Sequence, residues 1–139
     1  MSERAGVIIT DGERFLIGHA PNKKNEPNTW DLPKGHVEKG ETPYEAAKRE
    51  AKEEFNVNVE GMELAGKYKL GKDDFWIYVS LVNNLPVVAN CKCNSYFDWY
   101  GKKLPEISEF RLAKLDDIEG LLYKSLVSPV LKALGDFLD

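Results

Sequence analysis

One helix in this chain is marked at both of its ends, and it constrains the fold more than any other segment. Thr42 suits the N-cap, Pro43 suits the first helical position, and Glu45 completes a capping box with Thr42. Asn56 tolerates the left-handed conformation that closes a helix. At helical spacing, one face that we expect to pack on a sheet carries Tyr44, Ala47, Ala51 and Phe55.

Strands are predicted on both sides of this helix. Residues 4–10 and 13–18 are rich in β-forming residues, and Asp11-Gly12 between them predicts a hairpin. Further strands are predicted at 57–70, 74–82 and 109–115, and further helices at 116–122 and 128–138, the last with Leu131, Leu134 and Leu138 on one stripe. This alternation predicts a single α/β domain over residues 1–139, built on a mixed sheet.

The charge and composition exclude some classes of partner. The net charge of −4 argues against a protein held to nucleic acid by bulk charge, but not against an acidic substrate, because a bound cation reverses the local sign. No apolar run is long enough to span a membrane, and the N-terminus lacks a secretory signal. Cys91 and Cys93 flank a single residue, which disfavours a disulfide between them, so we interpret both as structural. We therefore expect a cytoplasmic protein with no membrane contact.

Three glutamates crowd one face of the predicted helix. Glu50, Glu53 and Glu54 stand at i, i+3 and i+4, where like charges repel one another. A hard divalent cation relieves such a cluster, and magnesium prefers oxygen ligands and is often shared with substrate phosphates. The alternative is a solvated acidic face without a ligand, and the three glutamates alone leave both interpretations open.

The segment from Gly35 to Val57 resembles the signature of the Nudix hydrolases, G-x5-E-x7-R-E-U-x-E-E-x-G-U, in which U is a bulky apolar residue. The residues that fall on this signature are Gly35, Glu41, Arg49, Glu50, Glu53, Glu54 and Val57. Ala51 is smaller than the usual apolar residue, and Asn56 replaces the second glycine. The resemblance implies an α/β/α sandwich with a mixed β-sheet. It also implies hydrolysis of a pyrophosphate bond in a nucleoside diphosphate linked to another group.

The resemblance further implies catalytic roles for these residues. Glu41 would lie near the metal, oriented by an ion pair with Arg49, whose rigid fork suits a carboxylate. The metal would be Mg²⁺, with Mn²⁺ as an alternative. Its implied ligands are the Gly35 carbonyl, Glu50, Glu53 and Glu54.

The general base has candidates inside and outside the signature. Glu53 is our first choice, because it belongs to the carboxylate cluster. The downstream candidates are Glu106, which precedes the last predicted strand, and Glu109, which begins it. The alternative for both downstream residues is an ordinary surface acid.

Four residues are candidates for substrate binding. The segments RAGVI and WDLPKGH look like the diadenosine-tetraphosphate hydrolase branch of the family. From these segments, Arg4, Lys34 and His36 would contact phosphates, where arginine acts as a fork and lysine as a point charge. Tyr78 would stack on a base. The alternatives are solvated charge for Arg4 and Lys34, local hydrogen bonds for His36 and a core position for Tyr78.

Three functions compete for this chain. The first is an enzyme that hydrolyses a dinucleoside polyphosphate or a related small nucleotide. The second is a pyrophosphohydrolase of RNA 5′ ends, against which the net charge of −4 weighs. The third is a non-catalytic module that binds a nucleotide, which retention of every glutamate of the signature disfavours.

Overall fold

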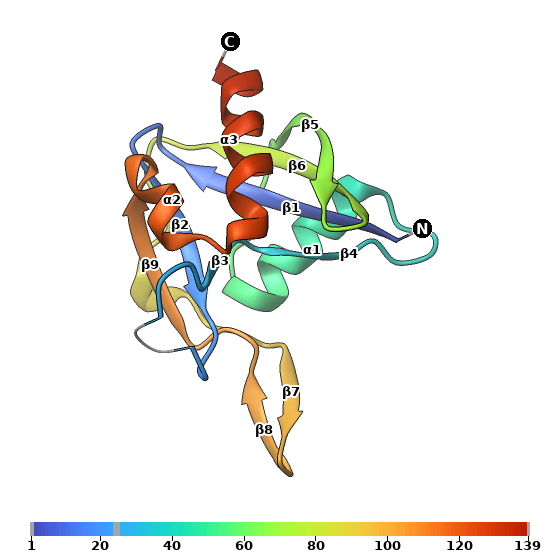
Figure 1. The fold of residues 1–139 in the computed structure, drawn as a ribbon, viewed down its shortest axis with the longest axis vertical. Helices are drawn as coiled ribbons and strands as arrows, with labels where there is room; N and C mark the ends of the chain where they lie inside the picture. The colour runs from blue at the N-terminus through green and yellow to red at the C-terminus, as the bar shows by residue number, and fades with distance from the viewer. Residues whose placement is uncertain (1, 24–25, 139) are drawn as a thin grey trace.

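A mixed β-sheet lies between two helical layers (Figure 1). The computed structural model describes residues 2–23 and 26–138, and it describes only the backbone of Leu138. Within these residues, seven strands form the sheet: β1 (Glu3–Thr10), β2 (Arg14–His19), β3 (Trp30–Asp31), β4 (Lys34–His36), β5 (Glu63–Leu70), β6 (Asp73–Leu81) and β9 (Glu109–Lys114). The helices are α1 (Pro43–Phe55), α2 (Ile118–Leu121) and α3 (Lys124–Leu138), with the 3-10 turns η1 (Val88–Asn90) and η2 (Leu115–Asp117).

The central strand β1 holds the sheet together. It runs parallel to β6 along its whole length, whereas the other strand pairs of the sheet are antiparallel. β1 pairs with β2 near their hairpin, at Thr10 and Phe15, and with β4 at its other end, where Arg4–Gly6 face Lys34–His36. With α1 on one face and α3 on the other, this arrangement confirms the predicted α/β sandwich with a mixed sheet (Figure 1).

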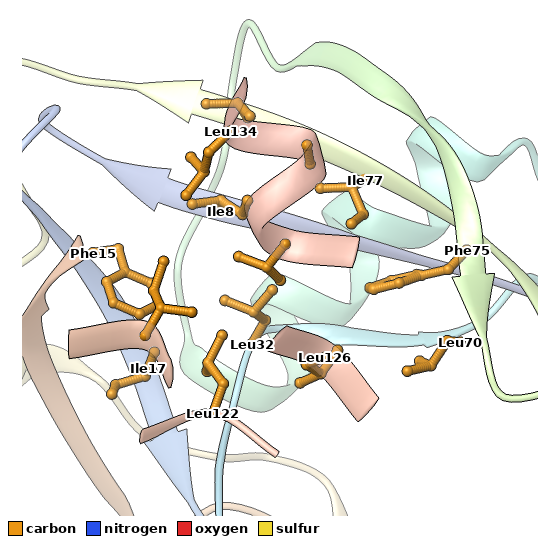
Figure 2. Close-up of a cluster of buried hydrophobic side chains, with 14 of the residues drawn as sticks. Ile8, Phe15, Ile17, Leu32, Leu70, Phe75, Ile77, Leu122, Leu126 and Leu134 are labelled. Carbon is orange, nitrogen blue, oxygen red and sulfur yellow. The ribbon is translucent and has the colours of Figure 1, made fainter. Parts of the chain in front are cut away.

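Each face of the sheet has its own apolar core, because successive strand residues point to opposite faces. On the α3 side, Ile8, Phe75 and Ile77 pack with side chains from α3 and from the segment that leads into it (Figure 2). On the α1 side, the core consists of strand residues and the apolar face of α1, and it includes Ala5, Val7, Ile9, Tyr78, Ala46, Ala47, Ala51 and Phe55. Both faces of the central strands are therefore buried.

Helix α1 begins and ends as the sequence predicts. The Thr42 hydroxyl accepts from the Glu45 N–H at 3.1 Å, and the Glu45 carboxylate accepts from the Thr42 N–H at 2.9 Å. Asn56 closes the helix in the left-handed conformation, with φ of 59°. Because the caps are local, they could be recognised without the tertiary structure.

Two boundaries differ from the prediction. β5 begins at Glu63 rather than at residue 57, after a turn that contains Gly61 with φ of 62°. α3 begins at Lys124 rather than at residue 128 and takes Pro129 into its interior. Its buried face is formed by Leu126, Val130, Ala133 and Leu134. Leu131 is 41% exposed, so the predicted stripe was wrong at that residue, and the side chain of Leu138 lies outside the described part.

The region without a sequence prediction contains a projecting hairpin, formed by β7 (Tyr96–Trp99) and β8 (Lys102–Pro105) (Figure 1). Its base is joined to α1, because the Asn94 N–H donates to the Glu53 carbonyl at 2.6 Å. Cys93 is buried beside this base, and both cysteines are free. None of the helices within the described ranges is long and apolar enough to cross a membrane.

We predict that Phe55→Ala lowers the free energy of unfolding by about 3–5 kcal/mol, because the ring is fully buried between α1 and the sheet. Chemical denaturation monitored by circular dichroism measures this loss. Val87→Ala is the matched control, because Val87 is 61% exposed, and its effect should stay within about 0.5 kcal/mol. Equal losses in the two variants would contradict the packing described above.

Candidate active site

Strand β4 brings the chain against the acidic face of α1. The Lys34 N–H donates to Oε1 of Glu54 at 3.0 Å, and the Glu54 side chain is buried. A side chain at position 35 would overlap the carboxylate of Glu50, so only glycine lets β4 and α1 approach this closely. Gly35, Glu50 and Glu54 thus meet where β4 crosses α1.

Arg49 organises the carboxylates around this meeting point. Its Nε and Nη2 donate to the two oxygens of Glu41 at 2.7 and 3.0 Å, which is a bidentate pair. Its Nη1 donates to Glu50 at 2.7 Å and to Glu53 at 3.3 Å. Its Nη2 also donates to the His36 carbonyl at 3.0 Å. The predicted ion pair between Arg49 and Glu41 is therefore present, and it belongs to a larger network.

The electrostatics differ between the carboxylates of this network. The hydrogen bond from Arg49 lowers the pKa of Glu41. Burial, followed by the charge of Glu50, raises the pKa of Glu54 to about 9. Burial also raises the pKa of Glu50, against the opposing charge of Arg49. Within the described residues, Glu54 forms no ion pair with a basic side chain.

The donor set fits a hard divalent cation in its chemistry. A cation beside Glu50 and Glu54 would favour their charged forms and offset the cost of burying two acids on one face. Carboxylate and carbonyl oxygens suit magnesium or manganese better than zinc. In the parts of the chain that the structure describes, no group of three acidic, histidine or cysteine side chains is arranged to hold a metal ion. The guanidinium of Arg49 lies between Glu50 and Glu53 and forms an ion pair with each.

A cleft of about 410 Å³ lies beside β4, on the α3 side of the sheet. Two predicted phosphate-binding residues line it, Arg4 and Lys34. Both are held by acids: Arg4 Nε donates to Asp73 at 2.8 Å, and Lys34 Nζ donates to Asp31 at 3.1 Å. Each cation keeps further N–H groups that these bonds do not use. Lys34 therefore links the two parts of the site, because its backbone bonds Glu54 and its side chain faces the cleft.

The other two predicted substrate-binding residues do not line the cleft. Tyr78 is 7% exposed and lies in the α1-side core with its ring against Tyr44, so its assignment as a base-stacking residue is corrected. The physical reason is strand parity, because Tyr78 points to the face opposite the cleft. His36 is exposed at the end of β4, and its Nδ1 lies 2.9 Å from the hydroxyl of Ser2, which is distant in sequence.

The candidates for the general base lie in different environments. Glu53 lies 3.3 Å from Nη1 of Arg49, farther than Glu41 or Glu50 lies from the guanidinium, and its side chain is 45% exposed. The Glu106 N–H donates to the Ser95 carbonyl, next to the Asn94 contact with Glu53, so Glu106 lies on the segment that borders the end of α1. Glu109 instead pairs with the buried ring of His19 at 3.3 Å.

Sequence reasoning missed Asp31, Tyr123 and Ser125, which also line the cleft. Asp31 lies within the WDLPKGH segment, and its position three residues before Lys34 was a usable signal for the ion pair. Tyr123 and Ser125 lie at the start of α3, where the predicted helix began too late. No local pattern places that segment beside β4.

The family model of the NUDIX domain matches residues 2–128. The chain belongs to the Nudix family. It is 32% identical to a 17.7 kDa uncharacterized protein of Enterobacteria phage T4 over 119 residues, which cover 78% of this chain and 79% of that protein.

Two further likenesses place this Nudix chain among known sequences and folds. It is 33% identical over 78 residues to an RNA pyrophosphohydrolase of Azorhizobium caulinodans, a match that covers 56% of this chain and 40% of that protein. The fold is similar to that of a C. elegans Ap4A hydrolase, with a TM-score of 0.61 at 24% identity over 98% of each chain. The protein is thus a Nudix hydrolase, and members of this family use a divalent metal.

We predict that Gly35→Ala lowers kcat at least tenfold while the free energy of unfolding changes little. The added methyl group would displace the carboxylate of Glu50, which is the movable end of a flexible side chain. Steady-state kinetics and thermal denaturation measure the two effects. Gly40→Ala is the contrasting variant, since nothing lies near an added Cβ there, although φ of 85° strains the backbone. Normal kcat in Gly35→Ala would contradict the close approach of β4 and α1.

Proposed function

We propose that this domain hydrolyses a pyrophosphate bond in a nucleoside diphosphate linked to another group, with Mg²⁺ as the cation. The observation that carries the proposal is the position of Lys34, which joins the buried acids of α1 to a cleft lined by cationic groups. Because the cleft lies on the α3 side of the sheet and the carboxylates lie on the α1 side, a phosphate chain bound in the cleft would reach the carboxylates past the short strand β4. That arrangement matches the needs of phosphoryl transfer, which depends on positioning and on charge stabilisation.

The proposed roles follow from the contacts of each residue. Glu50, Glu53, Glu54 and the Gly35 carbonyl would hold the cation. When bound, the cation polarises a phosphoryl oxygen and lowers the pKa of water. Arg49 positions Glu41, Glu50 and Glu53 through four hydrogen bonds, and a fifth holds it to the His36 carbonyl. Arg4 and Lys34 bind the phosphates with the donors that Asp73 and Asp31 leave free.

Glu53 is the proposed general base. Its bond to Arg49 is longer than that of Glu50, and its side chain is the most exposed among Glu50, Glu53 and Glu54. It can therefore reach an incoming water and accept its proton at a carboxylate oxygen. Glu106 is the second candidate, because its segment is bonded to the end of α1.

A dinucleoside polyphosphate or a related small nucleotide is the proposed substrate class. The two segments that resemble the diadenosine-tetraphosphate hydrolase branch each contribute a cleft residue, Arg4 from the first and Lys34 from the second. A cleft of about 410 Å³ has the size of a small-molecule site. The second candidate is an RNA 5′ end, which the similarity to the RNA pyrophosphohydrolase of Azorhizobium caulinodans favours.

We predict that Glu53→Gln lowers kcat by about a hundred- to ten-thousandfold, because the amide cannot accept the proton of the attacking water. Glu106→Gln is the matched variant, and it should lower kcat by less than tenfold. Single-turnover kinetics at saturating Mg²⁺ compares the two chemical steps, and circular dichroism checks the fold. The reverse order of the two effects would move the general base to Glu106.

The substrate class is tested by kcat/KM for diadenosine tetraphosphate, ADP-ribose and a short 5′-triphosphate RNA at one salt concentration. We expect the dinucleoside polyphosphate to be preferred at least tenfold. Excess chelator should abolish turnover of every substrate, because the proposed chemistry needs a divalent cation. A tenfold preference for the RNA would promote the RNA-end function. Absence of turnover of all substrates, with retained nucleotide binding, would indicate the non-catalytic module.

A further inference from the structure

A second and larger cavity lies beyond the cleft, between β5 and the first turns of α3. Its volume is about 590 Å³, which is the size of a small-molecule site. Its wall contains four lysines, two from β5 and two from α3: Lys67, Lys69, Lys124 and Lys132. The hydroxyls of Ser125 and Ser128 belong to the same wall. The cavity is therefore lined largely by hydrogen-bond donors.

The charge of this cavity is opposite to that of the whole chain. The chain carries a net charge of −4, whereas the wall of this cavity carries four lysines. Within the described residues, Lys69 is neutralised by Asp74 at 2.7 Å. Lys67 lies over the ring of Trp76 at 5.2 Å, and Trp76 packs against the α1-side core, so the ammonium of Lys67 lies on the face of the sheet opposite α3. Lys124 and Lys132 form no ion pair within residues 2–23 and 26–138. Two positive charges, both from α3, are thus available to an anion in this cavity.

The cavity adjoins the cleft. The same two segments line both of them: Leu70 and Gly71 in the cleft follow Lys67–Lys69 in the cavity, and Ser125 belongs to both walls. α3 crosses this face of the sheet above β6 and beside β5 (Figure 1). The cleft and the cavity therefore lie side by side on the α3 side of the sheet, with Lys34 at the far wall of one and Lys132 in the wall of the other.

We propose that this cavity is a second phosphate-binding subsite, which holds the remote nucleotide of a substrate that extends beyond the cleft. The inference rests on the proposed function, and it predicts selectivity for substrates that carry phosphate on both sides of the cleaved bond. The near part of the chain contacts Arg4 and Lys34, and the remote part contacts Lys124 and Lys132. The ammonium groups are exposed, so each contact contributes modestly and is weakened by salt.

The test is the double variant Lys124→Gln/Lys132→Gln, which removes two charges and keeps side-chain length close to that of lysine. We expect KM for diadenosine tetraphosphate to rise about three- to tenfold with kcat nearly unchanged. KM for ATP, which ends within the cleft, should change less than twofold. The double variant Lys102→Gln/Lys103→Gln is the control, because it removes the same charge from exposed positions on β8.

A binding measurement separates this inference from the proposed function. Calorimetry with inorganic tripolyphosphate in excess chelator measures binding without turnover. The affinity for tripolyphosphate should fall at least threefold in Lys124→Gln/Lys132→Gln and stay unchanged in the β8 control. If diadenosine tetraphosphate is not hydrolysed, the proposed function fails while this measurement still decides the subsite. Unchanged tripolyphosphate affinity overturns the subsite. If Lys124→Gln/Lys132→Gln raises KM equally for diadenosine tetraphosphate and ATP, the cavity does not hold the remote nucleotide.

Discussion

The site depends on the hydrogen bonds between the guanidinium of Arg49 and the surrounding glutamates. Like charges at i, i+3 and i+4 on one helix face repel one another, and burial raises the cost of their ionisation. Arg49 offsets this cost with hydrogen bonds to Glu41, Glu50 and Glu53, and its bond to the His36 carbonyl ties α1 to the end of β4. A lysine in its place would supply charge but not the planar fork that bonds both oxygens of Glu41.

Strand β4 lies between the Arg49 network and the cleft and contacts both. Gly35 faces the carboxylates on the α1 side of the sheet, whereas the side chain of Lys34 faces the cleft on the α3 side. Successive strand residues alternate between the two faces, so two neighbouring positions serve opposite layers. The backbone N–H of Lys34 also bonds Glu54, which ties the backbone of β4 to the buried acid.

Features set within one helix could be predicted from the sequence, whereas features set by packing between elements could not. The caps of α1 and the apolar face of Ala47, Ala51 and Phe55 were predicted correctly, because both depend on spacing within one helix. Tyr78 was placed in the wrong surroundings, because both faces of β6 are buried and alternation alone cannot tell which face meets the substrate. The start of α3 was predicted four residues too late, since the burial of Leu126 against the sheet outweighs the disfavoured Pro129.

The sequence by itself determined the chemistry of α1: its ends, its buried face and the identity of its clustered acids, all set by contacts between residues at most a few turns apart. The tertiary structure alone decided which cationic and hydroxyl groups accompany those acids. Tyr123, Ser125 and the lysines of α3 reach β4 and β5 only because α3 packs across the α3-side core. That packing is driven by burial of apolar area, which is non-directional and leaves no fixed spacing in the sequence.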